Sequence, residues 1–166
     1  MELNYWELNE KQDTSGSSLD GKICKFLNVF DNGGGPENKF VSFRNDNLLL
    51  RAIYNKDDGM PIKFVACPGM PDTYYLWNNW PGQNKWISFA NDGKWLFARY
   101  TEKSDALPIK FKKYSENNNG TYQGPCYTMQ GVWNGKDHDH ISFTTDGSQM
   151  RMWYATSSAM TVVLVE

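Results

Sequence analysis

The fold is predicted by a four-residue stretch that the chain repeats three times, as Phe40-Val41-Ser42-Phe43, Trp86-Ile87-Ser88-Phe89 and His140-Ile141-Ser142-Phe143. Each copy is followed by a polar turn and then, at the same offset, by an apolar run ending in tyrosine, at Tyr54, Tyr100 and Tyr154. The copies begin 46 and 54 residues apart. Periods of this length usually mark structural units that stack or surround a common axis. We therefore expect three similar units.

Each unit contains four candidate strands and shows no sustained helical period, so the predicted class is all-β. The turns between second and third strands are Asn-Asp-Asn, Asn-Asp-Gly and Thr-Asp-Gly, which suit tight hairpins. The expected domain spans residues 23–166 after an N-terminal extension at 1–22, with units at about 23–68, 72–115 and 124–166. The predicted strands are 26–30, 40–43, 48–54 and 62–66, then 74–77, 86–89, 95–100 and 109–112, then 127–133, 140–143, 150–154 and 161–165.

This pattern resembles the β-trefoil, in which three four-stranded lobes close a short barrel. The Lys-aromatic-Val-or-Ile-Ser-Phe strand, the Asp-Gly hairpin and the Ile-Lys-Phe strands at Ile62 and Ile109 are most similar to the fascin and amaranthin-agglutinin branch. The ricin-type branch fits less well because no copy contains Gln-x-Trp. A small β-propeller or another β-barrel is the alternative, although a propeller generally needs at least four blades.

Composition narrows the class of protein. The 166 residues are 40% hydrophobic and 15% aromatic, which indicates one folded domain, and the net charge of −2 argues against nucleic-acid and anionic-membrane partners. No apolar stretch approaches the roughly 20 residues that cross a bilayer, so no membrane insertion is expected. The N-terminus has no export signal, which predicts a cytoplasmic or non-classically secreted protein. The three cysteines, Cys24, Cys67 and Cys126, are expected to be buried reduced thiols.

The segment at 74–84 is the strongest candidate for a binding site, because it combines aromatic rings with side-chain amides. Rings can pack against the apolar face of a sugar while amides satisfy its hydroxyls, so a neutral or weakly polar glycan is the expected ligand. The structural alternative for Trp80 and Trp133 is core packing between units. The predicted ligand-binding residues are Trp77, Asn78, Asn79, Trp80 and Asn84, with a second, weaker site at Trp133, Asn134 and Asp137.

Catalysis is not predicted, since the chain has no nucleophile elbow, phosphate loop or HExxH motif. His138 and His140 alone are a weak metal signal, so neither a metal nor a cofactor is expected. The leading hypothesis is a non-catalytic, lectin-like protein that binds glycans or glycoproteins, as the resemblance to agglutinin trefoils also implies. The alternative is a protein-recognition module, such as a trefoil protease inhibitor or a cytoskeletal or receptor-binding domain, acting through loops 28–39 and 115–125.

Overall fold

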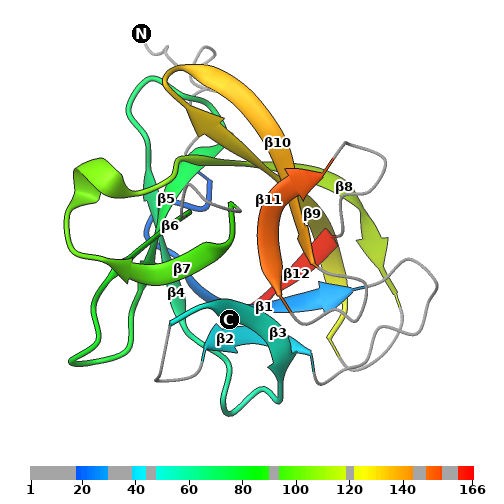
Figure 1. Ribbon diagram of the computed structural model, residues 1–166. Coiled ribbons are helices and arrows are strands. Elements are labelled where there is room, and N and C mark those ends of the chain that lie inside the picture. The colour runs from blue at the N-terminus through cyan, green and yellow to red at the C-terminus, as the bar shows by residue number, and fades with distance from the viewer. Residues whose placement is uncertain are drawn as a thin grey trace, which may run out of the picture.

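The computed structural model describes residues 18–29, 39–43, 48–89, 94–118, 122–143, 149–154 and 161–166, which form an all-β structure (Figure 1). These ranges contain one helical element, the 3-10 turn η1 (Lys103–Asp105), and no helix long and apolar enough to cross a membrane. The strands are β1 (Ile23–Val29), β2 (Phe40–Phe43), β3 (Leu50–Tyr54) and β4 (Ile62–Ala66), then β5 (Thr73–Asn78), β6 (Trp86–Phe89), β7 (Leu96–Tyr100) and β8 (Ile109–Asn117), then β9 (Gly124–Trp133), β10 (Lys136–Phe143), β11 (Met150–Tyr154) and β12 (Thr161–Val165). The prediction of an all-β chain is confirmed.

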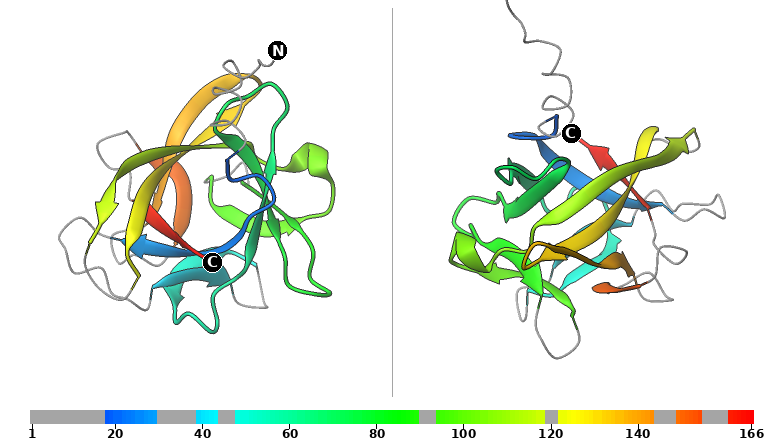
Figure 2. Two further views of the ribbon diagram at one scale, coloured as in Figure 1. Left: turned by 180° about the vertical axis from the view of Figure 1, so that it is seen from behind. Right: turned by 90° about the horizontal axis from the view of Figure 1, so that it is seen from above.

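The strand pairing follows one rule in all three units, and every pairing is antiparallel. The first strand of a unit pairs with the second and the fourth, and the second pairs with the third. The fourth strand also pairs with the first strand of the next unit, and β12 returns to β1 (Figure 2). Six strands therefore pair in a closed cycle. In Figure 1 the β2–β3 hairpin lies at the bottom, the β6–β7 hairpin at the left, and the β10–β11 hairpin runs from the top to the centre.

The repeated stretch occupies the same register position in each unit. Phe40 pairs with Tyr54, Trp86 pairs with Tyr100 and His140 pairs with Tyr154. In each hairpin the register shifts immediately after that first pair. The predicted equivalence of the three leading residues is confirmed, and it allows the units to be compared residue by residue.

The repeated stretch is buried on both faces of its hairpin. Its Val or Ile has no exposed surface in any unit, as expected for the core face, and its serine is at most 2% exposed. Because successive residues of a strand point to opposite faces, the serines must lie on the side away from the Val or Ile, and that side is covered as well. The residues concerned are Val41, Ile87 and Ile141, and Ser42, Ser88 and Ser142.

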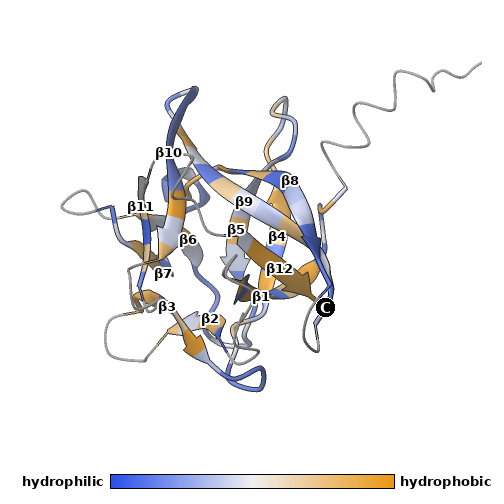
Figure 3. Ribbon diagram, turned by 90° about the vertical axis from the view of Figure 1, so that its right-hand side faces the viewer, coloured by the Kyte–Doolittle hydropathy of each residue, from blue (hydrophilic) through white to orange (hydrophobic). Residues whose placement is uncertain are grey.

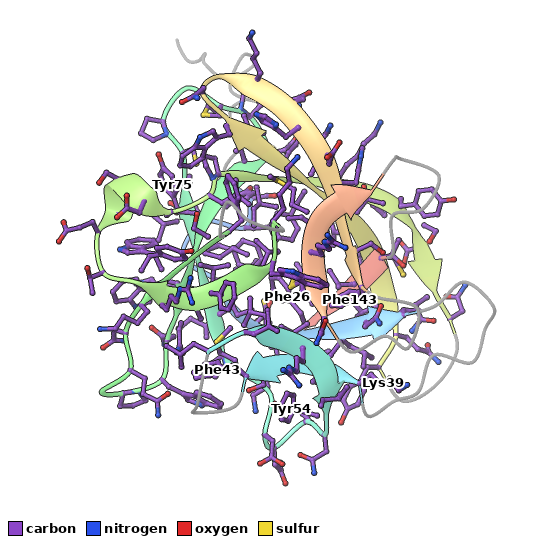
Figure 4. The ribbon with its side chains drawn as sticks, in the orientation of Figure 1. Phe26, Lys39, Phe43, Tyr54, Tyr75 and Phe143 are labelled. Atoms are coloured by element: carbon purple, nitrogen blue, oxygen red, sulfur yellow. The ribbon has the colours of Figure 1, made fainter. Side chains whose placement is uncertain are left out.

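Aromatic rings fill the space enclosed by the six cyclically paired strands. Phe64 of β4 is fully buried, and its ring centroid lies 5.1 Å from Phe111 and 5.4 Å from Tyr74. Phe26 of β1 contacts both phenylalanines at 5.8 Å, and it lies toward the middle of the molecule in Figure 4. Most of these pairs are edge-to-face, the arrangement that the ring quadrupole favours.

The residues just before β1 belong to the packed body. Leu19 joins the main core cluster, and Asp20 accepts a hydrogen bond from the Ala66 N–H through its Oδ1 at 2.8 Å. The Gly21 N–H donates to the Phe64 carbonyl, and the Phe64 N–H donates to the Lys22 carbonyl. This part of the predicted extension therefore lines β4, whereas residues 1–17 lie outside the described ranges.

Two hairpins are longer than predicted. β8 continues to Asn117 and β9 begins at Gly124, so the two strands pair well beyond the core. β10 begins at Lys136 because Asn134 and Gly135 both have positive φ, 53° and 76°, which suits a two-residue hairpin turn. The added segments are held by cross-strand pairing and not by burial, so apolar patterning does not reveal them. Figure 3 shows hydrophilic residues along the outer part of the β9–β10 hairpin.

Candidate functional site

The structure divides the predicted loop residues into an inner and an outer set. Asn78 belongs to the inner set, because it has no exposed surface. Its Nδ2 donates a hydrogen bond to the Gln83 carbonyl at 2.9 Å, and its Oδ1 accepts one from the Trp80 N–H at 3.0 Å. The exposed Asn84 donates through Nδ2 to the carbonyls of Asn78 and Trp80, at 3.2 and 3.3 Å. The half-buried Asn79 donates its backbone N–H to Pro61. Asn78 thus organises the loop from inside.

Trp80 and Trp133 have the same structural role in two units. Both are partly buried and pack against the main core cluster. The Trp80 ring lies edge-on to Phe43 at 5.7 Å, and the Trp133 ring lies edge-on to Phe89 at 5.4 Å. Each tryptophan therefore meets the repeated phenylalanine of the preceding unit. These contacts agree with the structural alternative, in which the two indoles fill the junctions between units.

The other members of the second predicted site stand on the β9–β10 hairpin. Asn134 is exposed in the two-residue turn. Asp137 is also exposed, and its carboxylate forms an ion pair with Lys110 Nζ at 3.0 Å. Asn134 and Asp137 are therefore used in a turn and in an ion pair, while Trp133 packs against Phe89.

A different cluster emerges from the strand register on the outer face of β4 to β7. Lys63 pairs with Trp77, Trp77 with Trp86, and Trp86 with Tyr100. Directly paired residues point to the same face, so these four side chains form a line across four strands, which we call the second-unit row. All four are half-buried, and the Trp77 and Trp86 ring centroids are 4.5 Å apart at 63°.

Tyr75 extends this row, and the local pattern of β5 explains why. Tyr74 and Leu76 are buried, whereas Tyr75 and Trp77 alternate with them and are half-buried on the opposite face. The Tyr75 ring lies edge-on to Trp86 at 6.1 Å, and Figure 4 shows Tyr75 near η1. Tyr75 and Trp86 were not among the predicted site residues. The alternation of β5, together with a tryptophan at the head of the repeated stretch, was the signal available for them.

Polar and charged groups border these rings. Lys103 Nζ lies 5.4 Å from the Tyr75 centroid, and Arg99 Cζ lies 5.7 Å from the Tyr100 centroid. The Tyr75 hydroxyl is hydrogen-bonded to the Cys67 thiol. Burial raises the pKa of Cys67 to about 11 and also raises the pKa of Tyr75, so both groups are protonated near neutral pH. Tyr75 is thus a neutral hydrogen-bonding group beside one cation, Lys103.

The first unit has the same row with a covering ring. Val163 pairs with Leu27, Leu27 with Phe40, and Phe40 with Tyr54. Tyr122, from the segment before β9, lies edge-on to Phe40 at 5.5 Å. Phe40 has no exposed surface, and Leu27 is 4% exposed. The chain's own side chains therefore cover this row.

In the third unit the row is polar. Lys110 pairs with Gln130, Gln130 with His140, and His140 with Tyr154. Lys110 is neutralised by Asp137, and Gln130 donates through Nε2 to the His138 carbonyl at 2.8 Å. The same scaffold thus carries a covered apolar row, an open aromatic row and a polar row.

His140 is expected to make the stability of the protein depend on pH. The pKa of its imidazole is lowered, mainly by burial. The carboxylates of Asp139 and Asp137 act in the opposite direction and raise this pKa, and Lys112 lowers it slightly further. The unfolded chain, with a histidine pKa near 6.5, then binds the proton more tightly, so stability is lost as the pH falls through about 6.5. The denaturant midpoint of the parent should fall more between pH 8 and pH 5 than that of His140→Phe, which carries the first-unit residue. Parallel midpoints across this range would contradict the assignment.

Comparison with known proteins adds no assignment, since no protein family matches the chain and no curated protein matches it. No group of three or more His, Cys, Asp or Glu residues that could hold a metal ion is found in the described ranges. Cys24, Cys67 and Cys126 are all buried and free, as predicted.

Proposed function

We propose that the protein is a non-catalytic, lectin-like carbohydrate-binding protein, and that the second-unit row, with Tyr75, is its binding surface. The observation that carries the proposal is the contrast between units. At the same register positions, the first unit buries Leu27 and Phe40 beneath its own side chains, whereas the second unit leaves Trp77 and Trp86 half-buried on an outer face.

The chemistry of the row suits a sugar. An indole or phenol ring offers a flat apolar surface to the C–H face of a pyranose. The loop 79–85 connects the strands that carry Trp77 and Trp86, so its exposed amides, Gln83 and Asn84, belong to the segment that joins the two middle members of the row. Side-chain amides both donate and accept hydrogen bonds, as neighbouring sugar hydroxyls require.

We also propose that the architecture is a β-trefoil. The cyclic pairing of six strands and the contact among three equivalent hairpins support it. With one open aromatic row in the described part of the chain, we expect a monomer to capture glycans without agglutinating cells, because cross-linking needs at least two sites. This expectation replaces the two binding sites predicted from the sequence.

The decisive variant borrows residues from the third unit. Trp77→Gln with Trp86→His installs the residues that Gln130 and His140 represent at the same register, so the fold is expected to be retained. Loss of two stacking rings should reduce glycan affinity about tenfold or more, since about 1.4 kcal/mol corresponds to a factor of ten. A glycan array with the parent identifies the ligand, and calorimetric titration then measures the loss.

The matched control exchanges a tryptophan outside the row. Trp95→Leu installs the residue found at the equivalent position Leu49, and it should bind glycan within about twofold of the parent. If the double variant binds glycans as tightly as the parent does, the row is not the binding surface.

The second candidate function is protein recognition through the β8–β9 hairpin. Tyr114 on β8 is 71% exposed, which favours a contact surface for another protein. Loop 28–39 lies largely outside the described residues. If the double variant changes nothing while Tyr114→Ala abolishes binding to a protein partner, the recognition module replaces the lectin proposal.

A further inference from the structure

We infer that the saccharide bound at the second-unit row carries an anionic group, a carboxylate or a sulfate, and that Lys63 recognises it. This inference rests on the proposed carbohydrate-binding function and names the substrate class of that same surface. It departs from the neutral or weakly polar glycan expected from the amide-rich loop.

Lys63 and Lys110 are equivalent lysines, but only Lys110 has an anionic partner in the described part of the protein. Lys63 on β4 pairs with Trp77, and Lys110 on β8 pairs with Gln130, so the two lysines hold the same register position in neighbouring units. Lys110 has an anion within the protein, because both oxygens of Asp137 lie within 3.1 Å of its Nζ. No carboxylate in the described part of the chain forms an ion pair with Lys63, which is half-buried beside an indole. A bound ligand can supply the missing anion.

Two further cationic side chains, Lys103 and Arg99, lie near the tyrosines of the second unit. Lys103 lies over Tyr75 with its Nζ 5.4 Å from the ring centroid, whereas Arg99 lies over Phe97 at 3.9 Å and is farther, 5.7 Å, from the Tyr100 centroid. Within the described ranges neither side chain has a carboxylate at ion-pair distance, although Glu102 and Asp105 are close to Lys103 in the sequence. The lysines paired elsewhere are Lys22, Lys94, Lys110 and Lys113.

The positions of the tryptophans and of Lys63 determine how the ligand is oriented. Its ring lies against the tryptophans, and its acidic group lies toward Lys63, which is the direct neighbour of Trp77 across the strands. Hydrogen bonds between a cation and a carboxylate or sulfate are about twice as strong as neutral ones, so the acid contributes both affinity and orientation. Although the whole chain is slightly acidic, the row presents cations to the ligand.

The test is a calorimetric titration of the full chain with three tetrasaccharides. The probes are an oligogalacturonate, which carries carboxylates, a sulfated galactose oligomer, and a neutral galactose oligomer. We expect an acidic probe to bind at least tenfold more tightly than the neutral one in 50 mM salt, and to weaken progressively toward 500 mM. The acidic probe that binds identifies the anion as carboxylate or sulfate, and binding by either supports the inference.

Paired variants assign the effect to one lysine. Lys63→Gln should reduce affinity for the acidic probe at least fivefold more than it reduces affinity for the neutral probe, whereas Lys63→Arg should retain the preference for the acidic probe. Lys110→Gln, at the equivalent position, should leave both affinities unchanged. Denaturant midpoints establish that each variant is folded.

The two possible failures are distinguishable. If the neutral probe binds as well as the acidic ones and Lys63→Gln changes nothing, the inference is wrong while carbohydrate binding stands. If the parent binds no saccharide on an array of neutral and acidic glycans, the proposed function fails and the inference fails with it.

Discussion

Replacing Phe64 with alanine should lower the free energy of unfolding by about 3–5 kcal/mol, the range typical of deleting a fully buried phenylalanine. Phe64 has no exposed surface, and its ring contacts Phe26, Tyr74 and Phe111 with centroid distances of 5.1 to 5.8 Å. The substitution removes apolar burial and three aromatic contacts, and it leaves a cavity that neighbouring strands cannot easily close.

Urea denaturation followed by tryptophan fluorescence measures this loss. The control is Leu164→Ala. Leu164 of β12 pairs with Phe26 of β1, and Phe64 of β4 pairs with Leu76 of β5, so Leu164 and Phe64 hold equivalent positions in two units. Leu164 differs in that it is only half-buried. We expect the control to cost less than about 2 kcal/mol. A loss below about 1 kcal/mol for Phe64→Ala would show that the centre of the molecule is packed differently.

Phe40→Ala should cost about as much, 3–5 kcal/mol, whereas Trp86→Ala at the equivalent position should cost less than about half of that. Phe40 is fully buried in a second cluster with Leu27 and Val163, and Tyr122 covers it. Trp86 heads the same repeated stretch in the second unit but remains half-buried. The comparison holds the register position constant, while the side chain and its burial differ.

The two variants are measured side by side under the same denaturation conditions. A matching loss in both would mean that Trp86 is covered as completely as Phe40, and the surface proposed for carbohydrate binding would then not exist. Tyr122→Ala offers a further check, since removing the covering ring should destabilise the parent but have little additional effect in a Phe40→Ala background.

The fold was largely predictable from short-range patterns. Hairpin turns and period-two burial identify strands without knowledge of their partners, which is why 40–43 and 86–89 are found with the predicted bounds and 140–143 forms the last part of β10. The outer parts of β8, β9 and β10 escaped prediction, because residues such as Lys113 and Lys136 carry no apolar alternation and are held by cross-strand pairing.

The candidate site was less predictable, and parity is the reason. Adjacent residues on a strand face opposite sides, so Trp77 and Asn78, which look like one motif in sequence, separate into an outer ring and an inner loop anchor. Trp86 joins Trp77 only through strand pairing, and Tyr75 joins them through the shared face. The high density of rings and amides locates the segment in the sequence, but it does not tell which of its side chains face outward and which face inward.

The sequence by itself determined that the chain is all-β and that Phe40, Trp86 and His140 are equivalent, because turn chemistry and alternation are local properties that each unit repeats. Only the tertiary structure decided that these three positions differ in exposure. Tyr122 reaches Phe40 through the β8–β9 hairpin, and Asp137 reaches Lys110 through β10. Burial and charge pairing depend on residues brought together from distant parts of the chain, so the open row in the second unit becomes visible only when all three units are assembled.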